Sequence, residues 1–172
     1  SLSIGSVSAI GSTFKGSAVL SSDQQVIATI VQFDKSGAVK NRPLSNGFAA
    51  TDSSAKQLVA TVLKNSGGYS TYFSVQNTEA AAINVTVSFF AAGATSATTT
   101  ATANNLPANA AKYFDVKDIA ALPNGFSGSA IVTAKLASNN STEAKTVVTV
   151  DELEVAGGGS KSFEGASTSG AN

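Results

Sequence analysis

Two stretches of the sequence decide the fold: Tyr69-Ser70-Thr71-Tyr72-Phe73-Ser74-Val75 and Ile83-Asn84-Val85-Thr86-Val87-Ser88-Phe89. In both stretches, apolar or aromatic residues alternate with small polar ones. A period of two, carried by Val, Ile, Thr, Phe and Tyr, is typical of a half-buried β-strand. The two stretches therefore predict strands near 69–77 and 83–92.

The same pattern recurs along the chain in short runs that are closed by Gly, Asn, Ser or Pro. Further strands are predicted near 14–21, 25–34, 56–64, 97–103, 110–115, 127–135 and 145–155, with shorter pieces near 2–5, 46–50 and 161–165. The nearest approach to a helical period is at 116–122, where Pro123 limits it to a turn or two. This organisation predicts an all-β fold, an antiparallel β-sandwich of Ig-like or jelly-roll type.

An internal repeat relates the two ends of the chain. Phe14-Lys15-Gly16-Ser17-Ala18-Val19-Leu20 matches Phe126-Ser127-Gly128-Ser129-Ala130-Ile131-Val132, and after a shift Ile27-Ala28-Thr29-Ile30 matches Val147-Val148-Thr149-Val150. Apolar positions stay in register on both sides of the first match, which a chance likeness would not produce. We therefore expect Phe14 and Phe126 to occupy equivalent, largely buried positions.

The repeat also divides the chain. Residues 1–55 and 113–172 form two copies of one half-module, and residues 56–112 have no second copy. The chain is thus about one and a half repeats: an N-terminal half-repeat, 1–55, and a complete sandwich module, 56–172. A lone half-sandwich exposes an apolar face and unpaired strand edges. The N-terminal half either joins the complete module in an enlarged sandwich or pairs with another chain by strand addition.

Composition narrows the classes of function. Charged residues make up 13% of the 172 residues and the formal net charge is zero, so no basic surface is available for a nucleic-acid partner. No run of about 18 apolar residues predicts a membrane span. The low charge is typical of a surface outside the cell or one covered by other subunits. Because the sequence begins at Ser1 and lacks Met, we expect either a cleaved export signal or a fragment.

Catalytic residues are scarce. The chain contains neither His nor Cys, so a hydrolytic triad would need a lysine or carboxylate base, and no nucleophile-elbow motif is present. Glu152 and Glu154 share one face of a predicted strand and offer oxygen ligands to a hard cation, but a solvated strand face is the favoured interpretation. We therefore predict a protein that is not an enzyme and has no cofactor and no metal site.

Sugars are a weaker candidate ligand. Sugar platforms need exposed aromatic faces, whereas this chain has no Trp and only Tyr69, Tyr72 and Tyr113. Tyr72 alternates with apolar neighbours and is expected in the core. Separately, Asn139-Asn140-Ser141 and Asn140-Ser141-Thr142 match the N-glycosylation pattern in a polar loop, which makes Asn139 and Asn140 candidate attachment sites.

The N-terminal stretch is the sharpest candidate for a functional site. No charged side chain precedes Lys15, and Leu2 and Ile4 alternate with serine. Residues 1–14 are therefore a candidate donor strand, whose apolar side chains would fill a neighbour's groove while its backbone pairs with an open edge. The donor side chains are predicted to be Leu2, Ile4, Val7 and Ile10. The alternative is that this stretch forms an edge strand of its own domain.

A longer pattern runs through the chain: Leu63-Lys64-Asn65, Tyr69-Ser70-Thr71-Tyr72-Phe73-Ser74-Val75-Gln76-Asn77, Asn84-Val85-Thr86-Val87, Leu122-Pro123-Asn124-Gly125-Phe126-Ser127-Gly128-Ser129-Ala130 and Phe163-Glu164-Gly165. This pattern resembles the tandem β-sandwich repeats of secreted and cell-surface bacterial proteins. The resemblance covers nearly the whole chain, and its motifs carry no catalytic residues. Such modules in a short exported chain are also similar to subunits of extracellular filaments built by donor-strand exchange.

These resemblances imply a secreted, non-enzymatic structural protein, located outside the cell or on its surface. The expected function is that of a self-assembling subunit of a filament or surface layer, with other copies of the chain as its partners. Head-to-tail strand donation propagates because the contact does not close on itself. The alternative is an adhesion or glycan-binding module of a longer cell-surface repeat protein, with glycans or neighbouring surface proteins as partners.

Overall fold

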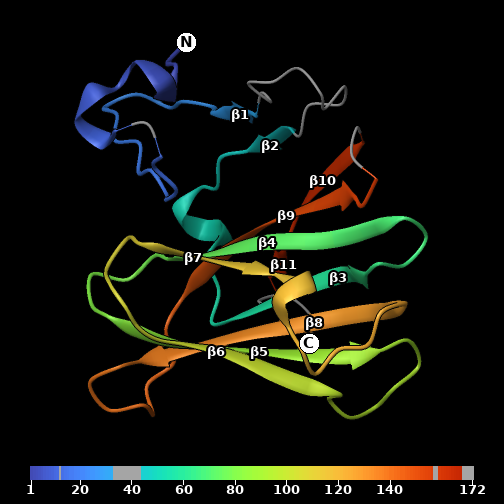
Figure 1. The fold of residues 1–172 in the computed structure, drawn as a ribbon. Coiled ribbons are helices and arrows are strands. Elements are labelled where there is room, and N and C mark those ends of the chain that lie inside the picture. Colours follow the sequence, from blue (N-terminus) through green and yellow to red (C-terminus); the bar gives the residue numbers. More distant parts are fainter. Residues whose placement is uncertain (12, 33–43, 157–158, 168–172) are drawn as a thin grey trace.

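The computed structural model describes residues 1–11, 13–32, 44–156 and 159–167 of the chain. Its regular structure in these residues consists of antiparallel strands and single 3₁₀ turns (Figure 1). Two sheets pack face to face, and a thinner layer of N-terminal residues lies over one of them. The prediction of an all-β, antiparallel sandwich is confirmed.

The two packed sheets are named here by their size. The four-stranded sheet has the order β10-β9-β4-β7, with β10 (Ser160–Glu164), β9 (Thr146–Glu154), β4 (Tyr69–Asn77) and β7 (Ala111–Asp115). The five-stranded sheet has the order β11-β3-β8-β5-β6, with β11 (Ala166–Ser167), β3 (Lys56–Lys64), β8 (Phe126–Leu136), β5 (Ile83–Ala91) and β6 (Thr99–Leu106). Successive strands often change sheet, so the chain wraps around a core that lies between the sheets.

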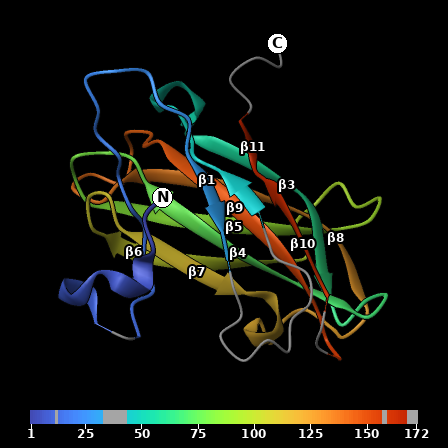
Figure 2. The same cartoon turned by 90° about the horizontal axis from the view of Figure 1, so that it is seen from above.

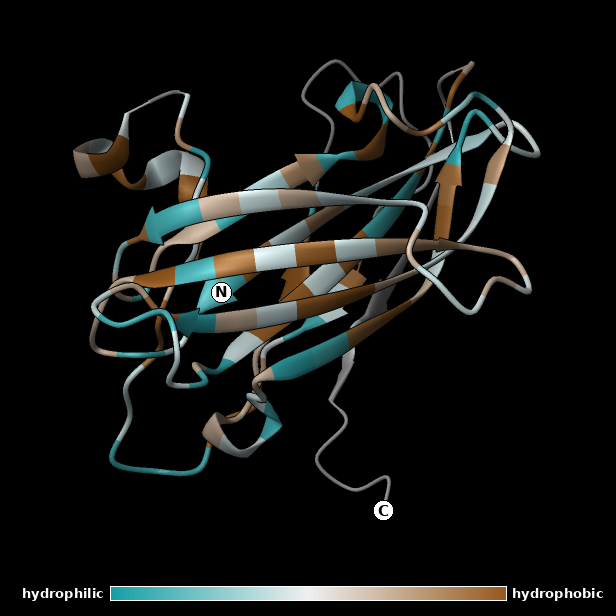
Figure 3. Cartoon of the chain, turned by 90° about the horizontal axis from the view of Figure 1, so that it is seen from below, coloured by the Kyte–Doolittle hydropathy of each residue, from teal (hydrophilic) through white to brown (hydrophobic). Residues whose placement is uncertain are grey.

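Alternation along each strand selects the face that points into this core. In β5, Ile83, Val85, Val87 and Phe89 are buried, and the residues between them are only half-buried. The same alternation appears as bands of brown and teal along the strands in Figure 3. Strand β3 keeps both Val59 and Val62 buried across an irregularity in register between them, because the bulge shifts the buried parity by one residue.

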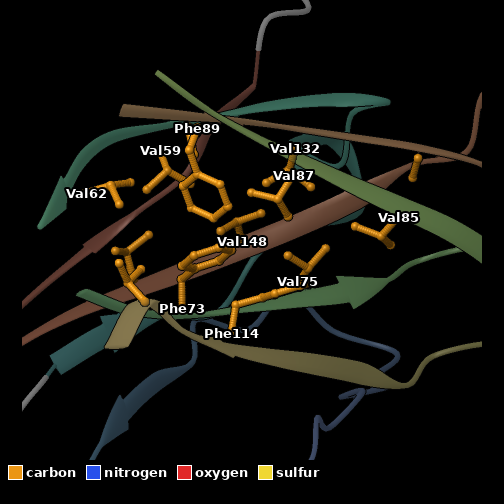
Figure 4. Close-up of a cluster of buried hydrophobic side chains, with 14 of the residues drawn as sticks. Val59, Val62, Phe73, Val75, Val85, Val87, Phe89, Phe114, Val132 and Val148 are labelled. Atoms are coloured by element: carbon orange, nitrogen blue, oxygen red, sulfur yellow. The ribbon is translucent and has the colours of Figure 1, made fainter. Parts of the chain in front are cut away.

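Three phenylalanines tie the two sheets together at the centre of the core (Figure 4). Phe73 of β4 stacks on Phe114 of β7, with ring centroids 5.1 Å apart, and lies 6.4 Å from the tilted ring of Phe89 on β5. All three side chains are buried. Offset and tilted ring pairs of this kind add about 0.5–1.5 kcal/mol each to the burial of their apolar area.

A buried asparagine fixes the end of the sandwich where β4 leaves its sheet. Asn77 is fully buried, and its amide nitrogen donates to the carbonyl oxygens of Ala81, Leu106 and Pro107 at 2.8, 3.1 and 2.9 Å. Its side-chain oxygen accepts from the backbone N–H of Glu79. The side chain thus joins the β4–β5 and β6–β7 connections. Each hydrogen bond offsets part of the free-energy cost of removing the amide from water.

The N-terminal residues form a layer of their own over the outer face of the four-stranded sheet (Figures 1 and 2). The layer contains the 3₁₀ turns η1 (Ile4–Ser6), η2 (Ser8–Ile10) and η3 (Ala50–Asp52) and the strands β1 (Thr29–Val31) and β2 (Leu44–Asn46). Strands β1 and β2 pair with each other and form a separate two-stranded sheet. In the described residues, both packed sheets take their strands from 56–167, so the N-terminal half does not enlarge the sandwich.

Several predicted N-terminal strands are wrong. Residues 14–21 contain no strand, the piece predicted near 2–5 overlaps a 3₁₀ turn, and the piece predicted near 46–50 is replaced by β2. The strand predicted at 25–34 shrinks to β1, with residues 33–34 outside the described residues. A strand needs a hydrogen-bonding neighbour as well as an alternating pattern, and these segments lie outside the packed sheets. The turn predicted at 116–122 is present as η4 (Val116–Asp118).

The expected equivalence of Phe14 and Phe126 is also wrong. Phe126 begins β8 and is 5% exposed, whereas Phe14 lies outside any strand and is 49% exposed. A local likeness remains, because each ring folds over the glycine two residues further on. A Cβ added to Gly16 would lie 2.5 Å from the ring tip of Phe14, and one added to Gly128 would lie 3.0 Å from that of Phe126. The two matched sequences therefore share this local contact, but not their long-range packing.

Candidate assembly surface

Exposed large apolar side chains are concentrated in the N-terminal layer. In the described residues, ten lie in this layer, at Leu2, Ile4, Phe14, Val19, Leu20, Val26, Ile27, Ile30, Val31 and Leu44, and three lie in the sandwich, at Leu58, Leu153 and Val155. Single exposed apolar residues are normal on a soluble protein, but a gathering of them is typical of a surface that another molecule covers.

The four predicted donor residues lie at the start of this layer. Leu2 is 76% exposed and Ile4 is 52% exposed, whereas Val7 and Ile10 are half-buried. The backbone is not extended here, because the N–H of Val7 donates to the carbonyl oxygen of Ile4 and that of Ile10 to Val7. The structure therefore leaves the donor side chains accessible without placing them in an acceptor groove, and their role as donors stays a prediction.

A lysine holds the N-terminal layer to the outer face of the four-stranded sheet. The Nζ atom of Lys15 lies 5.1 Å from the ring centroid of Tyr72 on β4 and 5.4 Å from that of Tyr113 on β7. The hydroxyl of Tyr113 donates to the carbonyl oxygen of Gly16. We call Lys15, Tyr72 and Tyr113 the lysine clamp. Cation–π contacts of this kind contribute about 0.5–1 kcal/mol at exposed sites.

The clamp corrects the sequence interpretation of Tyr72. Tyr72 was expected in the core, but it is half-buried on the outer face of the sheet, since its neighbours Thr71 and Phe73 are the buried residues. The rings of Tyr72 and Tyr113 stack on each other, with centroids 5.6 Å apart and an interplanar angle of 26°. Because each ring faces the other and Lys15 lies over both, this pair does not form an open platform for a sugar.

The clamp shifts the ionisation of two of its members. Burial, and then the neighbouring Tyr72, raise the pKa of Tyr113 above 10.0. Hydrogen bonding and charge interaction with Tyr72 raise the pKa of Lys15 above 10.5. Both shifts favour the protonated side chain in the folded state. The stabilisation linked to them is complete below about pH 10 and is lost as the pH rises through the folded pKa values.

We expect the Tyr113 phenol to ionise at a higher pH than a free tyrosine. The measurement is an ultraviolet absorbance titration of tyrosinate, taken as the difference between the wild type and Tyr113→Phe. Phenylalanine keeps the ring in the clamp and removes the titrating hydroxyl together with its hydrogen bond to Gly16, so the difference curve reports the ionisation of this group. A difference curve centred at or below pH 10 would contradict the expected shift.

The candidate glycosylation residues lie in the exposed loop between β8 and β9. The side-chain oxygen of Asn139 accepts from the backbone N–H groups of Ser141 and Thr142, and its amide donates to the Thr142 hydroxyl at 2.9 Å. Asn140 is exposed in the left-handed backbone region, with φ of 52°, and its side-chain oxygen accepts from Asn84. Both residues are thus on the surface, and their modification stays a prediction.

The carboxylates do not gather into a metal site in the described part of the chain. No cluster of three or more His, Cys, Asp or Glu side chains occurs there that could hold a metal ion. Glu152 is buried, and its strand β9 lies inside the sheet between β10 and β4, so the interpretation of a solvated strand face is wrong for this residue. No helix among the described residues is long and apolar enough to cross a membrane.

Comparisons of the chain with protein-family models, with curated proteins and with solved structures find no match.

Proposed function

We propose that this protein is a non-enzymatic structural subunit that assembles with copies of itself into an extracellular filament or surface layer by donating a β-strand. One observation carries the proposal: the exposed large apolar side chains of the described residues are concentrated in an N-terminal layer that joins neither packed sheet. The first 14 residues of this layer contain no charged side chain, so their transfer out of water is inexpensive.

The magnitudes favour a donor made of several side chains. An extended strand places Leu2, Ile4 and Ile10 on one face and Val7 on the other, and complete burial of the first face contributes about 1.5–3 kcal/mol for each of its three residues. Association opposes this with about 4–15 kcal/mol of lost freedom. Each new backbone hydrogen bond adds about 0.5–1.5 kcal/mol. Leu2 and Ile4 alone therefore do not suffice, whereas the full strand with its ladder gives a net attraction.

Secretion and a location at the cell surface are part of the same proposal. The low charge suits a Ser-, Thr- and Ala-rich protein whose surface is partly covered in an assembly. A head-to-tail contact in which each copy both donates and accepts a strand is heterologous. When the rotation between copies does not close a ring, such a contact extends without limit.

Removal of residues 1–10, or the change Ile4→Asp, is expected to abolish polymers and leave a soluble monomer of similar strand content. The aspartate would place a charge in a groove that is dry in the assembly, which costs several kcal/mol unless the carboxylate is paired. The measurement is size-exclusion chromatography with negative-stain imaging, and circular dichroism checks the fold. Ser3→Asp is the control, because its side chain points to the opposite face of an extended strand.

Two results would contradict the proposal. Unchanged polymers in both variants would show that residues 1–10 are not the donor. A wild-type protein that stays monomeric at every concentration would remove self-assembly itself.

A further inference from the structure

The five-stranded sheet ends in an open and uncharged edge at β6. Strand β6 pairs on one side with β5, and on its other side no strand of the described residues lies next to it. Its eight residues, Thr99–Leu106, include no charged side chain and no proline. Soluble proteins normally protect an edge of this kind with charges, proline or a cover, because it is a template for strand addition.

The other sheet edges differ from β6. Strand β7 carries Lys112 and Asp115, and the Tyr113 between them is engaged by the lysine clamp. Strand β10 contains a lysine and a glutamate in its sequence, and β11 is only two residues long. In the described residues β11 pairs only with Gln57 and Leu58 of β3, but β3 carries Lys56 and Lys64. Among the described edges, β6 is therefore the long strand without a charged side chain.

The two faces of β6 suit an incoming amphipathic strand. Ala101 and Ala103 point inward and pack against the core, whereas Thr100, Thr102 and Asn104 are exposed on the outer face. A strand added beside β6 would continue both rows. Leu2 and Ile4 are two residues apart, so an extended N-terminus would place both on the apolar row, with the serines between them on the polar row.

The N-terminal segment leaves the sandwich on the side where β6 and β7 meet. The hydroxyl of Ser17 donates to the carbonyl oxygen of Asn109, in the connection between β6 and β7, and Lys15 lies over Tyr113 of β7. Figure 2 shows the N-terminal turns on this side of the molecule. Within one chain, however, residues 4–10 fold into 3₁₀ turns and do not pair with β6.

We propose that the free edge of β6 is the acceptor, and that residues 1–10 of a second copy of this chain pair with it as an added strand. The inference rests on the proposed function and names the partner surface of that function. Residues 1–10 are long enough to cover Thr99–Ala103, the part of β6 that pairs regularly with β5 before the irregularity at Asn104 and Asn105. The 3₁₀ turns are short and make few hydrogen bonds, so their conversion to an extended strand forfeits little.

The change Ala101→Lys is expected to abolish polymers, with Thr102→Lys as its matched control. A lysine at 101 lies on the inward row at the sheet edge, where its ammonium reaches water only while the edge is free, so an added strand would bury the charge. A lysine at 102 lies on the exposed face, where the polymer should persist. Chromatography and imaging follow assembly, and thermal unfolding shows that both variants fold.

A second measurement tests the pairing directly. The chain contains no cysteine, so a copy with Ser3→Cys can be mixed with copies carrying Thr100→Cys, Thr102→Cys or Asn104→Cys. Cross-strand neighbours lie about 4.5–5.5 Å apart, within the range of a disulfide. We expect a disulfide-linked pair of copies for at least one position, and none with Ser141→Cys in the β8–β9 loop.

The outcomes separate the two proposals. Polymers that survive Ala101→Lys, with no cross-link to β6, would overturn the acceptor while self-assembly stands. If the wild type forms no polymers but the Ser3→Cys copy still cross-links to a cysteine on β6, the filament proposal is contradicted and the assignment of β6 as the acceptor edge is supported. Polymers lost in Ala101→Lys alone, with the cross-link formed, support both.

Discussion

Truncation of Phe73 to alanine is expected to lower the free energy of unfolding by about 3–5 kcal/mol. Phe73 is 1% exposed and contacts Phe114 and Phe89, so its ring joins the two sheets at the centre of the core. The cavity left behind lies between β4 and β5, which are each hydrogen-bonded on both sides and cannot collapse into it. Small domains are stable by about 5–15 kcal/mol, so this single change removes a large share of that stability.

Chemical denaturation followed by tyrosine fluorescence or circular dichroism measures this effect. Phe14→Ala is the matched control, because it removes the same atoms from a side chain that is 49% exposed. We expect it to change the free energy of unfolding by about 0.5 kcal/mol or less. Equal losses from the two variants would show that Phe73 does not dominate the core.

The change Gly128→Ala is expected to destabilise the sandwich by about 3 kcal/mol or more, at the upper end of the range for overpacked cores. A Cβ at this position would lie 1.9 Å from the carbonyl oxygen of Phe90, which belongs to the backbone of β5. Strand β8 cannot move away, because Gly128 lies opposite Ala91 of β5 on one side and Val62 of β3 on the other.

The glycine that matches Gly128 in the sequence, Gly16, supplies the control for this variant. At Gly16 the three atoms nearest to an added Cβ all belong to the ring of Phe14 and none to the backbone. That ring is half exposed and can rotate away, so Gly16→Ala should leave the denaturation midpoint almost unchanged. A loss for Gly16→Ala as large as that for Gly128→Ala would mean that the surroundings of Gly16 are packed as tightly as those of Gly128, contrary to the structure.

The strands of the sandwich were predictable because each segment with an alternating pattern has a neighbouring strand there to which it is hydrogen-bonded. The predicted ranges 56–64 and 69–77 coincide with β3 and β4, and the other strands between residues 83 and 154 deviate by a few residues at their ends. The segment 14–21 carries the same pattern as β8, but it lacks neighbours equivalent to β3 and β5. An alternating pattern therefore predicts a strand correctly only where the rest of the chain supplies neighbouring strands to pair with it.

Part of the candidate site was also within reach of the sequence. The lack of charge before Lys15 and the apolar alternation at Leu2 and Ile4 led to the prediction of a donor strand. Both side chains are exposed, and their role as donors stays a prediction. The outward direction of Tyr72 could have been inferred, since Phe73 and Val75 share the inner face and a strand alternates. The lysine clamp could not have been found, because it joins residues distant in the sequence across two strands and a separate layer.

The position of β8 has a consequence for the order in which the molecule folds. Strand β3 pairs with β8 and β11, which both come much later in the sequence. Lys64 pairs with Phe126 and Lys56 with Thr133, so β3 cannot form its backbone hydrogen bonds until those residues are present. Such distant pairings make folding slow, because loop closure precedes the contacts that reward it. In a nascent chain, Val59 and Val62 therefore stay exposed to solvent until most of the chain has been synthesised. That delay suits the secretion proposed above, because export across a membrane requires an unfolded polypeptide. The unfolded chain must also be protected against aggregation during this time.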